Sequence, residues 1–285
     1  MIPFPLPPLV STNWLAAHIT EPGLVILDSS WYLPTTGRSA AEEFLVGHLP
    51  GALFFDLDAA SDEASPLPHM LPSESAFAQY VGSLGIGDDA AVVVYDGSGG
   101  NMSAARVWWM FRAFGHANVA VLDGGLGKWR EEGRPVEAGE IRATPRRLVA
   151  RLDAELVRSR SQVSAALLSG EAQVVDTRSA GRFQGTAPEP RAGLPSGHMP
   201  GAINLPYTEL VHPDGTGWTL AELRTRLAEA GVQVDRPVIA TCGSGTSACT
   251  LLHALFRLGQ DHAALYDGSW TEWAGTGMPV VKGER

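Results

Sequence analysis

The chain has 285 residues, which predicts two domains or one large α/β unit, because a domain usually holds roughly 100 to 200 residues. Hydrophobic residues make up 45% of it and charged residues 18%, proportions that exclude a disordered, collagen-like or coiled-coil protein. The net charge of −10, without any block of Lys or Arg, argues against nucleic acid or an anionic membrane surface as the partner.

No apolar run reaches the roughly 18 residues of a membrane helix, and the proline-rich start lacks the basic flank of a signal peptide. We therefore expect no membrane partner and a cytoplasmic location. The two cysteines, Cys242 and Cys249, are too few for a disulfide framework, and no suitably clustered histidines accompany them to bind zinc. What remains is a reactive thiol or two buried ones.

In the first half of the chain, short runs of β-branched residues alternate with helical patterns. Strands are predicted at Leu24–Asp28, Ala91–Tyr95 and Val119–Leu122. Apolar residues recur at helical spacing over residues 103–114, which predicts a helix. Prolines and the pair Arg146-Arg147 then interrupt both periodicities, and we expect an interdomain linker at residues 139–155.

The second half repeats this order, with strands predicted at residues 173–176, 237–241 and 263–266 and a helix at 247–258. Sequence motifs recur as well. Gly-His-Leu-Pro-Gly-Ala at residues 47–52 returns as Gly-His-Met-Pro-Gly-Ala at residues 197–202. We infer two copies of one α/β domain, residues 1–138 and 156–285, each with a mainly parallel sheet covered by helices on both faces.

Cys242 directly follows the predicted strand at residues 237–241, and ligands of open parallel sheets bind outside the carboxyl ends of the strands. Two glycines in the loop Cys-Gly-Ser-Gly-Thr-Ser let several backbone N–H groups point inward, at the amino end of the next helix. Such a nest favours a nucleophilic thiolate at Cys242. The alternative is that Cys242 is a small buried hydrophobic residue, and Cys249 is expected to pack in the core.

The first copy carries Asp96 at the position that corresponds to Cys242. A carboxylate cannot accept a sulfur atom, so we expect this copy to be catalytically inert. Four other polar residues at repeated turns or strand ends are interpreted as structural: His48, His198, Asp28 and Asp176.

These features together resemble the two-domain sulfurtransferases of the rhodanese superfamily, over nearly the whole chain. The thiosulfate-using group carries basic side chains in the cysteine loop, as in Cys-Arg-Lys-Gly, whereas the mercaptopyruvate-using group carries Cys-Gly-Ser-Gly-Val-Ser/Thr. The loop here is similar to the second group, except that Thr246 stands where valine is usual. We expect this hydroxyl to alter the polarity of the loop and to leave the reaction unchanged.

The resemblance implies a role for each site residue. Cys242 would accept sulfur from 3-mercaptopyruvate, with Ser244, His69 and Asp58 as a proton relay of the Ser-His-Asp kind. Arg182 and Arg191 would hold the carboxylate and carbonyl of the substrate. The remaining loop residues would contribute backbone N–H groups: Gly243, Gly245, Thr246 and Ser247. No metal or organic cofactor is implied, and the sulfur acceptor would be thioredoxin, a low-molecular-weight thiol or cyanide.

Each role has a plainer alternative. Arginines in loops are usually solvated surface charges, His69 lies in a proline-bracketed turn, and Asp58 could cap the turn that follows it. Three other functions compete. Thiosulfate could be the donor; a cysteine phosphatase would need Arg at the position of Ala248; and a non-catalytic sulfur carrier would not need two substrate-binding arginines.

Overall fold

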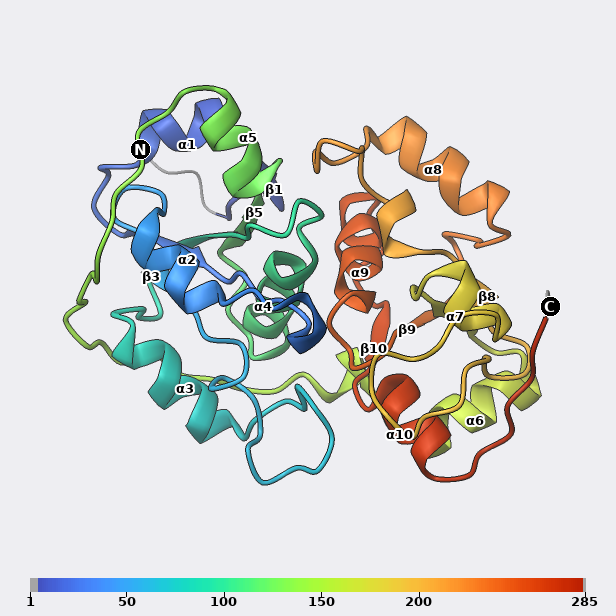
Figure 1. Cartoon of the computed structure of the whole chain (residues 1–285). Coiled ribbons are helices and arrows are strands. Elements are labelled where there is room, and N and C mark those ends of the chain that lie inside the picture. Colours follow the sequence, from blue (N-terminus) through green and yellow to red (C-terminus); the bar gives the residue numbers. More distant parts are fainter. Residues whose placement is uncertain (1–4, 284–285) are drawn as a thin grey trace. The chain divides into compact units, whose positions relative to one another are not determined.

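The computed structural model describes residues 5–283, which form two compact units (Figure 1). The first comprises the described chain up to Glu63, Leu71–Asp153 and Pro213–Gly217; the second comprises Ala64–Met70, Ala154–His212 and the described chain from Trp218 onward. His69 therefore belongs to the same unit as Cys242 although it lies in the first half of the sequence. Residues 1–4 and 284–285 lie outside the described residues; the first expected domain begins there and the second ends there. The domain bounds stay a prediction.

The first unit is built on a parallel sheet of five strands, ordered β1-β5-β4-β2-β3. The strands are β1 (Leu9–Val10), β2 (Leu24–Asp28), β3 (Leu53–Phe54), β4 (Ala91–Tyr95) and β5 (Val119–Leu122). The three strands expected from the sequence are thus confirmed, and they form the middle of the sheet. Both strands that the sequence did not reveal, β1 and β3, have two residues each, too short for a periodic pattern.

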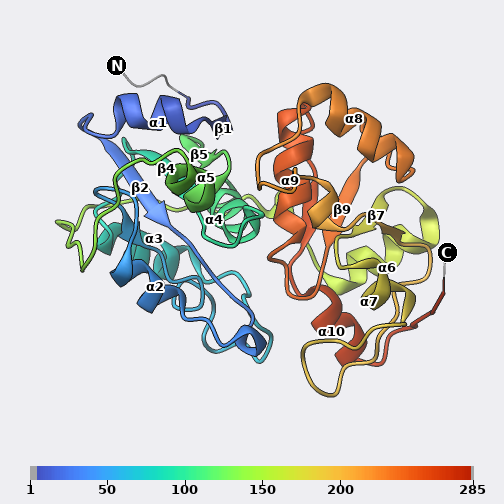
Figure 2. The same cartoon turned by 45° about the horizontal axis from the view of Figure 1, so that its top comes forward.

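Helices cover both faces of this sheet (Figure 2). They are α1 (Thr12–His18), α2 (Ala40–Val46), α3 (Glu74–Ser83), α4 (Met102–Ala113) and α5 (Gly125–Glu131). On one face, Leu15 of α1, Phe44 of α2 and Trp129 of α5 pack in one buried cluster with strand residues. Phe77 of α3 and Phe111 of α4 meet edge to face in a separate buried contact. This arrangement confirms the expectation of a parallel sheet covered by helices on both faces.

The second unit repeats the plan with strand order β6-β10-β9-β7-β8, all parallel. Its strands are β6 (Val157–Arg158), β7 (Gln173–Asp176), β8 (Ile203–Asn204), β9 (Val238–Thr241) and β10 (Ala264–Tyr266). Its helices are α6 (Arg160–Ser169), α7 (Ala180–Gln184), α8 (Leu220–Glu229), α9 (Ala248–Arg257) and α10 (Ser269–Gly275). The central strand, β9, leads into the cysteine loop. Among the described residues, no helix is long and apolar enough to cross a bilayer.

The repeated Gly-His-x-Pro-Gly turn makes the same contacts in each unit. Nδ1 of His48 donates to the backbone oxygen of Phe44 (2.8 Å), and Nδ1 of His198 donates to that of Phe183 (2.9 Å). Each imidazole also stacks on the ring of the same phenylalanine, with centroids 3.9 and 3.8 Å apart. Both histidines are buried and locked to neighbouring backbone, as their structural interpretation requires.

Candidate active site

Cys242 lies at the carboxyl end of β9, where the beginning of α10 holds its backbone. The N–H of Cys242 donates to Oγ of Ser269 (3.2 Å), and its carbonyl oxygen accepts from the N–H of Trp270 (3.0 Å). Ser269 adopts a left-handed backbone conformation with φ of 50°, which is uncommon for a residue other than glycine. The side chain of Cys242 is buried at 2% exposure, so the protein dictates what can approach the sulfur.

The loop after Cys242 presents several amide groups without a protein acceptor. Within residues 5–283, this is true of the N–H groups of Gly243, Ser244, Thr246 and Ser247. They precede the first residue of α9, where the helix dipole adds positive potential, and Gly245 makes the turn with a φ of +76°. Donors that the fold leaves unpaired at a helix start are suited to stabilise an anion. The loop thus has the features of an anion-binding site beside the thiol of Cys242.

Two arginines converge on this loop. A side chain built on Gly243 would place its Cβ 3.0 Å from Nη2 of Arg182 and 3.6 Å from Nη1 of Arg191. Nη2 of Arg191 also donates to Oγ of Ser244 (3.3 Å). The structure therefore brings both predicted arginines to the residue next to Cys242. Two guanidinium groups at one point present the paired N–H donors that a carboxylate and an adjacent carbonyl require.

A buried ion-pair network orients Arg182. Glu189, with its side chain 2% exposed, accepts from Nη2 of Arg182 (2.6 Å) and from Nη1 of Arg178 (2.7 Å). Arg178 is completely buried, lies 4.1 Å from the ring centroid of Trp270 and pairs with Asp176 (2.6 Å). Burial disfavours the charge on Arg178, but its pairing with Asp176 and Glu189 outweighs this effect and raises its pKa. Arg182 is thus held by Glu189, which is itself linked through Arg178 to Asp176 at the end of β7.

Sequence reasoning gave no role to Arg178, Glu189 or Ser269. One local signal for Arg178 exists, because the buried strand β7 ends at Asp176 and Thr177-Arg178 follows directly, at the edge of the sheet where ligands bind. The partnership of Arg178 with Glu189 joins residues eleven positions apart around an irregular loop, and no periodic pattern marks it. Asp176 accepts from the backbone N–H of Arg178 (2.9 Å), which fits its interpretation as an acceptor that fixes a loop.

His69 is placed beside the loop within the second unit. Its Nδ1 lies 3.0 Å from Oγ of Ser244 and 3.1 Å from Oγ1 of Thr246, and its side chain is buried. The backbone of His69 has a φ of 59°, a conformation that costs a residue other than glycine about 1–3 kcal/mol and recurs at functional sites. The structure thus joins three of the predicted site residues: Ser244, Thr246 and His69.

Asp58 belongs to the first unit, where its Oδ2 accepts from Nε1 of Trp31 (3.1 Å). The cap of the following turn is supplied by Asp56, whose Oδ1 accepts from the N–H groups of Asp58 (3.0 Å) and Ala59 (3.2 Å). The side chain of Asp56 thus accepts from two N–H groups of this turn. The role of Asp58 in orienting His69 stays a prediction.

The first unit fills the equivalent nest with its own carboxylate. Oδ1 of Asp96 accepts from the N–H of Ser98 (2.9 Å) and from its hydroxyl (2.6 Å). Oδ2 accepts from the N–H groups of Ser103 and Ala104, both at 3.0 Å. The side chain at this position occupies the place that an anionic ligand would take. This geometry gives a physical reason to expect an inert first copy.

Cys249 is completely buried on the first turn of α9, and its thiol donates to the carbonyl oxygen of Gly245 (3.3 Å). It therefore packs in the core, as the sequence led us to expect, and its hydrogen bond to Gly245 helps to hold the cysteine loop against α9. Within the described chain, no group of three or more His, Cys, Asp or Glu side chains is arranged to hold a metal ion.

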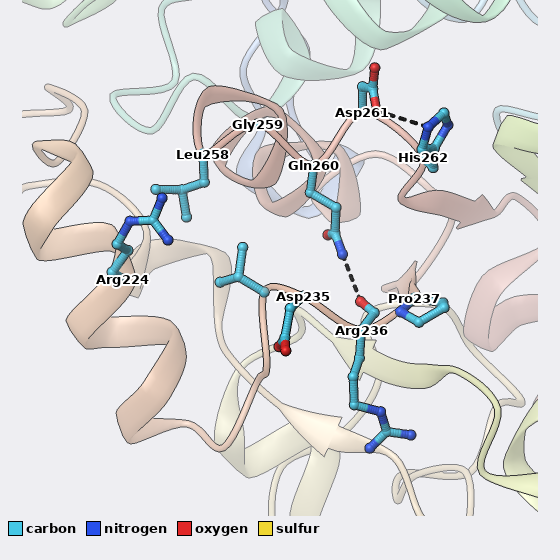
Figure 3. Close-up of a pocket in the computed structure, with 10 residues that line it drawn as sticks. Arg224, Asp235, Arg236, Pro237, Leu258, Gly259, Gln260, Asp261 and His262 are labelled. Carbon is cyan, nitrogen blue, oxygen red and sulfur yellow. Dashed lines mark hydrogen bonds and ion pairs between the residues drawn. The ribbon is translucent and has the colours of Figure 1, made fainter.

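A hollow in this unit lies at the end of the sheet opposite Cys242 (Figure 3). It measures about 560 Å³, and its lining includes Arg224 of α8 and Pro237, which precedes β9. Two polar contacts lie along its lining: Nε2 of His262 is 3.1 Å from Oδ1 of Asp261, and the side-chain amide of Gln260 donates to the backbone oxygen of Arg236 (2.6 Å). Parallel sheets bind ligands at the carboxyl ends of their strands, so the loop of Cys242 is the candidate active site.

Replacing Gly243 by alanine tests the approach of the two arginines. The added Cβ would lie 3.0 Å from Nη2 of Arg182, closer than ordinary van der Waals contact, and would push that guanidinium away by a few tenths of an ångström. We expect KM for a carboxylate-bearing sulfur donor to rise by about 3- to 30-fold, as when part of a charged hydrogen bond is lost. Steady-state kinetics measure this, and an unchanged KM would contradict the convergence of Arg182 on residue 243.

Most of the chain is similar to known proteins. Two segments, residues 11–132 and 159–276, each match the rhodanese-like domain family. Among curated relatives, the 3-mercaptopyruvate sulfurtransferase of Rattus norvegicus is 46% identical over 270 residues, which cover 93% of this chain and 91% of the relative. The thiosulfate sulfurtransferase of Bos taurus is 47% identical over 271 residues, with the same coverage of both chains.

One solved structure with a similar fold is SseA from Escherichia coli, whose description names the "Rhodanese" fold and the mechanism of 3-mercaptopyruvate sulfotransferases. It is 40% identical, with a TM-score of 0.85, and the match covers 92% of this chain and 98% of that one. Overall identity does not separate relatives that are named for the two donors. The choice between the two sulfur donors must therefore be argued from the side chains around Cys242.

Proposed function

The chain belongs to the rhodanese family, and we propose that it transfers sulfur from 3-mercaptopyruvate through a persulfide on Cys242, with release of pyruvate. The observation that carries the choice of donor is the convergence of Arg182 and Arg191 at Gly243, beside the thiol. A 2-oxo acid carries a carboxylate and a carbonyl on adjacent carbons. Two guanidinium groups at one point can bind both while the β-carbon and its sulfur extend toward Cys242.

In the first step, the thiolate of Cys242 attacks the sulfur of 3-mercaptopyruvate. A sulfur–sulfur bond forms, the carbon–sulfur bond breaks, and its electron pair remains on the carbon as the enolate of pyruvate. The proton of the donor thiol passes to that carbon, which leaves pyruvate and an anionic persulfide. In sites of the oxyanion kind, a single preorganised N–H donor contributes about 2.7–4 kcal/mol, and the amides of the loop supply such donors here.

Proton movement is assigned to Ser244 and His69. Ser244 lies within hydrogen-bond distance of both Nδ1 of His69 and Nη2 of Arg191, so its hydroxyl connects the imidazole to the substrate-binding group. A positioned relay of this type contributes about 10²- to 10⁴-fold in rate. Asp58 is proposed to orient His69, in keeping with the Ser-His-Asp pattern.

In the second step, an acceptor thiol removes the outer sulfur of the persulfide and regenerates the thiolate. Thioredoxin, a low-molecular-weight thiol or, in an assay, cyanide would serve as the acceptor. Because the two substrates react in separate half-reactions, we expect ping-pong kinetics.

Thiosulfate is the second candidate donor, and the bovine relative is named for it. Thiosulfate carries two negative charges, but the loop from Cys242 to Ser247 contains no Lys or Arg to meet the second charge. The oxo-acid group of mercaptopyruvate instead matches the two arginines. We therefore expect kcat/KM to be higher for 3-mercaptopyruvate.

The experiment is a comparison of the two donors under one set of conditions. Pyruvate release from 3-mercaptopyruvate and thiocyanate formation from thiosulfate are measured with cyanide as acceptor. The proposal predicts a higher kcat/KM for 3-mercaptopyruvate. Equal or better turnover of thiosulfate would overturn the choice of donor, and an inactive protein with both donors would overturn the function.

A further inference from the structure

The loop contains one hydroxyl more than the relay requires. Thr246 is 3% exposed, and its Oγ1 lies 3.1 Å from Nδ1 of His69, the same atom that lies 3.0 Å from Oγ of Ser244. A ring nitrogen has either one hydrogen or one lone pair, so it makes one strong hydrogen bond at a time. The two hydroxyls therefore share or alternate on a single atom.

The two hydroxyls differ in their other contacts. Oγ of Ser244 also accepts a hydrogen bond from Nη2 of Arg191 (3.3 Å), one of the arginines assigned to the substrate. In the proposed reaction Arg191 would turn toward the substrate carboxylate, and the surroundings of Ser244 would then change. The hydroxyl of Thr246 lies on the backbone that leads into α9, beside Nδ1 of His69.

We propose that Thr246 is a positioning residue, which holds Nδ1 of His69 while the hydroxyl of Ser244 exchanges its proton. When the hydroxyl of Ser244 has another partner, Thr246 takes its place as the hydrogen-bond partner of Nδ1. This inference rests on the proposed function. No atom is gained or lost in the exchange, because the proton moves between hydroxyl, imidazole and the reacting substrate. Thr246 acts through His69 and touches neither sulfur atom in this scheme.

The backbone of His69 gives this role a physical reason. A left-handed conformation at a residue other than glycine persists only where the surroundings hold it in place. Two hydroxyls on one ring atom, in a site where all three side chains are buried, restrict the rotation of the imidazole. A ring held in this way stays oriented for proton transfer through both half-reactions.

The test is a double-mutant cycle on pyruvate release, with T246V and S244A alone and combined. T246V removes only the hydroxyl, and we expect kcat to fall by about 3- to 10-fold with KM for 3-mercaptopyruvate unchanged, the loss of one ordinary hydrogen bond. T246S keeps a hydroxyl and should restore kcat. Because either hydroxyl can hold Nδ1, the combined loss should exceed the product of the single losses.

Thr250 provides the matched control. It is a buried threonine one turn along α9, and within residues 5–283 its hydroxyl has no hydrogen-bond partner. T250V should leave kcat unchanged. The inference is overturned if T246V matches T250V, if T246S fails to restore kcat, or if the combined loss equals the product of the single losses. A wild-type protein that releases no pyruvate would contradict both the inference and the proposed function, whereas normal wild-type turnover confines a failure to Thr246.

Discussion

Substitution of Cys242 by serine will abolish sulfur transfer from both donors. A serine hydroxyl stays protonated at neutral pH and forms no persulfide, so the variant lacks the covalent intermediate on which both half-reactions depend. The fold should be retained, because the anchors of this residue are backbone contacts to Ser269 and Trp270 that any side chain leaves in place. Pyruvate release from 3-mercaptopyruvate, followed with purified protein, measures the loss.

The matched control is the other cysteine. Substitution of Cys249 by serine keeps a donor for the carbonyl oxygen of Gly245 and removes only a buried sulfur, so this variant should turn over within a few-fold of wild type. Residual turnover in the Cys242 variant would contradict the assignment. A Cys249 variant that stays folded and loses all activity would indicate that Cys249, and not Cys242, is the reactive thiol.

Loss of Arg182 or Arg191 should weaken the donor reaction strongly, though less than loss of Cys242. Each guanidinium makes a charged hydrogen bond worth about 1.5–3 kcal/mol, so each substitution by glutamine should lower kcat/KM for 3-mercaptopyruvate by about 10- to 100-fold. Lysine should not rescue either position, because an ammonium group lacks the planar fork. Steady-state kinetics of the four single variants measure these losses.

Alkylation of Cys242 separates substrate binding from turnover. Iodoacetate carries a carboxylate and iodoacetamide does not, so the arginine variants should react more slowly with iodoacetate alone. Arg224, an exposed residue of the hollow at the far end of the sheet, offers the control, and its glutamine variant should behave as wild type (Figure 3). Equal slowing with both reagents would indicate a general disturbance of the loop and would contradict a role in binding the carboxylate.

The middle of each sheet could be read from the sequence because its strands are buried, β-branched runs bounded by turns. Strands β2, β4 and β5 matched their expected bounds, and β9 and β10 began one residue later than expected. The outer strands β1, β3, β6 and β8 escaped notice because two residues show no alternation. Their pairing follows from the rest of the sheet, not from their own composition.

In the site too, features formed by neighbouring residues could be predicted, and contacts between distant residues could not. The cysteine loop is contiguous, so glycine content and position after a strand were enough to single it out. The partnership of His69 with Ser244 joins residues 175 positions apart, and only the resemblance to a family pointed to it. For Thr246 the sequence indicated a change of polarity, and the structure identifies the atom that the extra hydroxyl contacts.

In the proposed reaction the sulfhydryl of Cys242 itself receives the sulfur. Intact-protein mass spectrometry of the wild-type protein, after incubation with 3-mercaptopyruvate and without any acceptor, detects this step. We expect a gain equal to one sulfur atom, located on the peptide that contains Cys242, together with one equivalent of pyruvate. Release of pyruvate without that gain, or a gain located on Cys249, would contradict it.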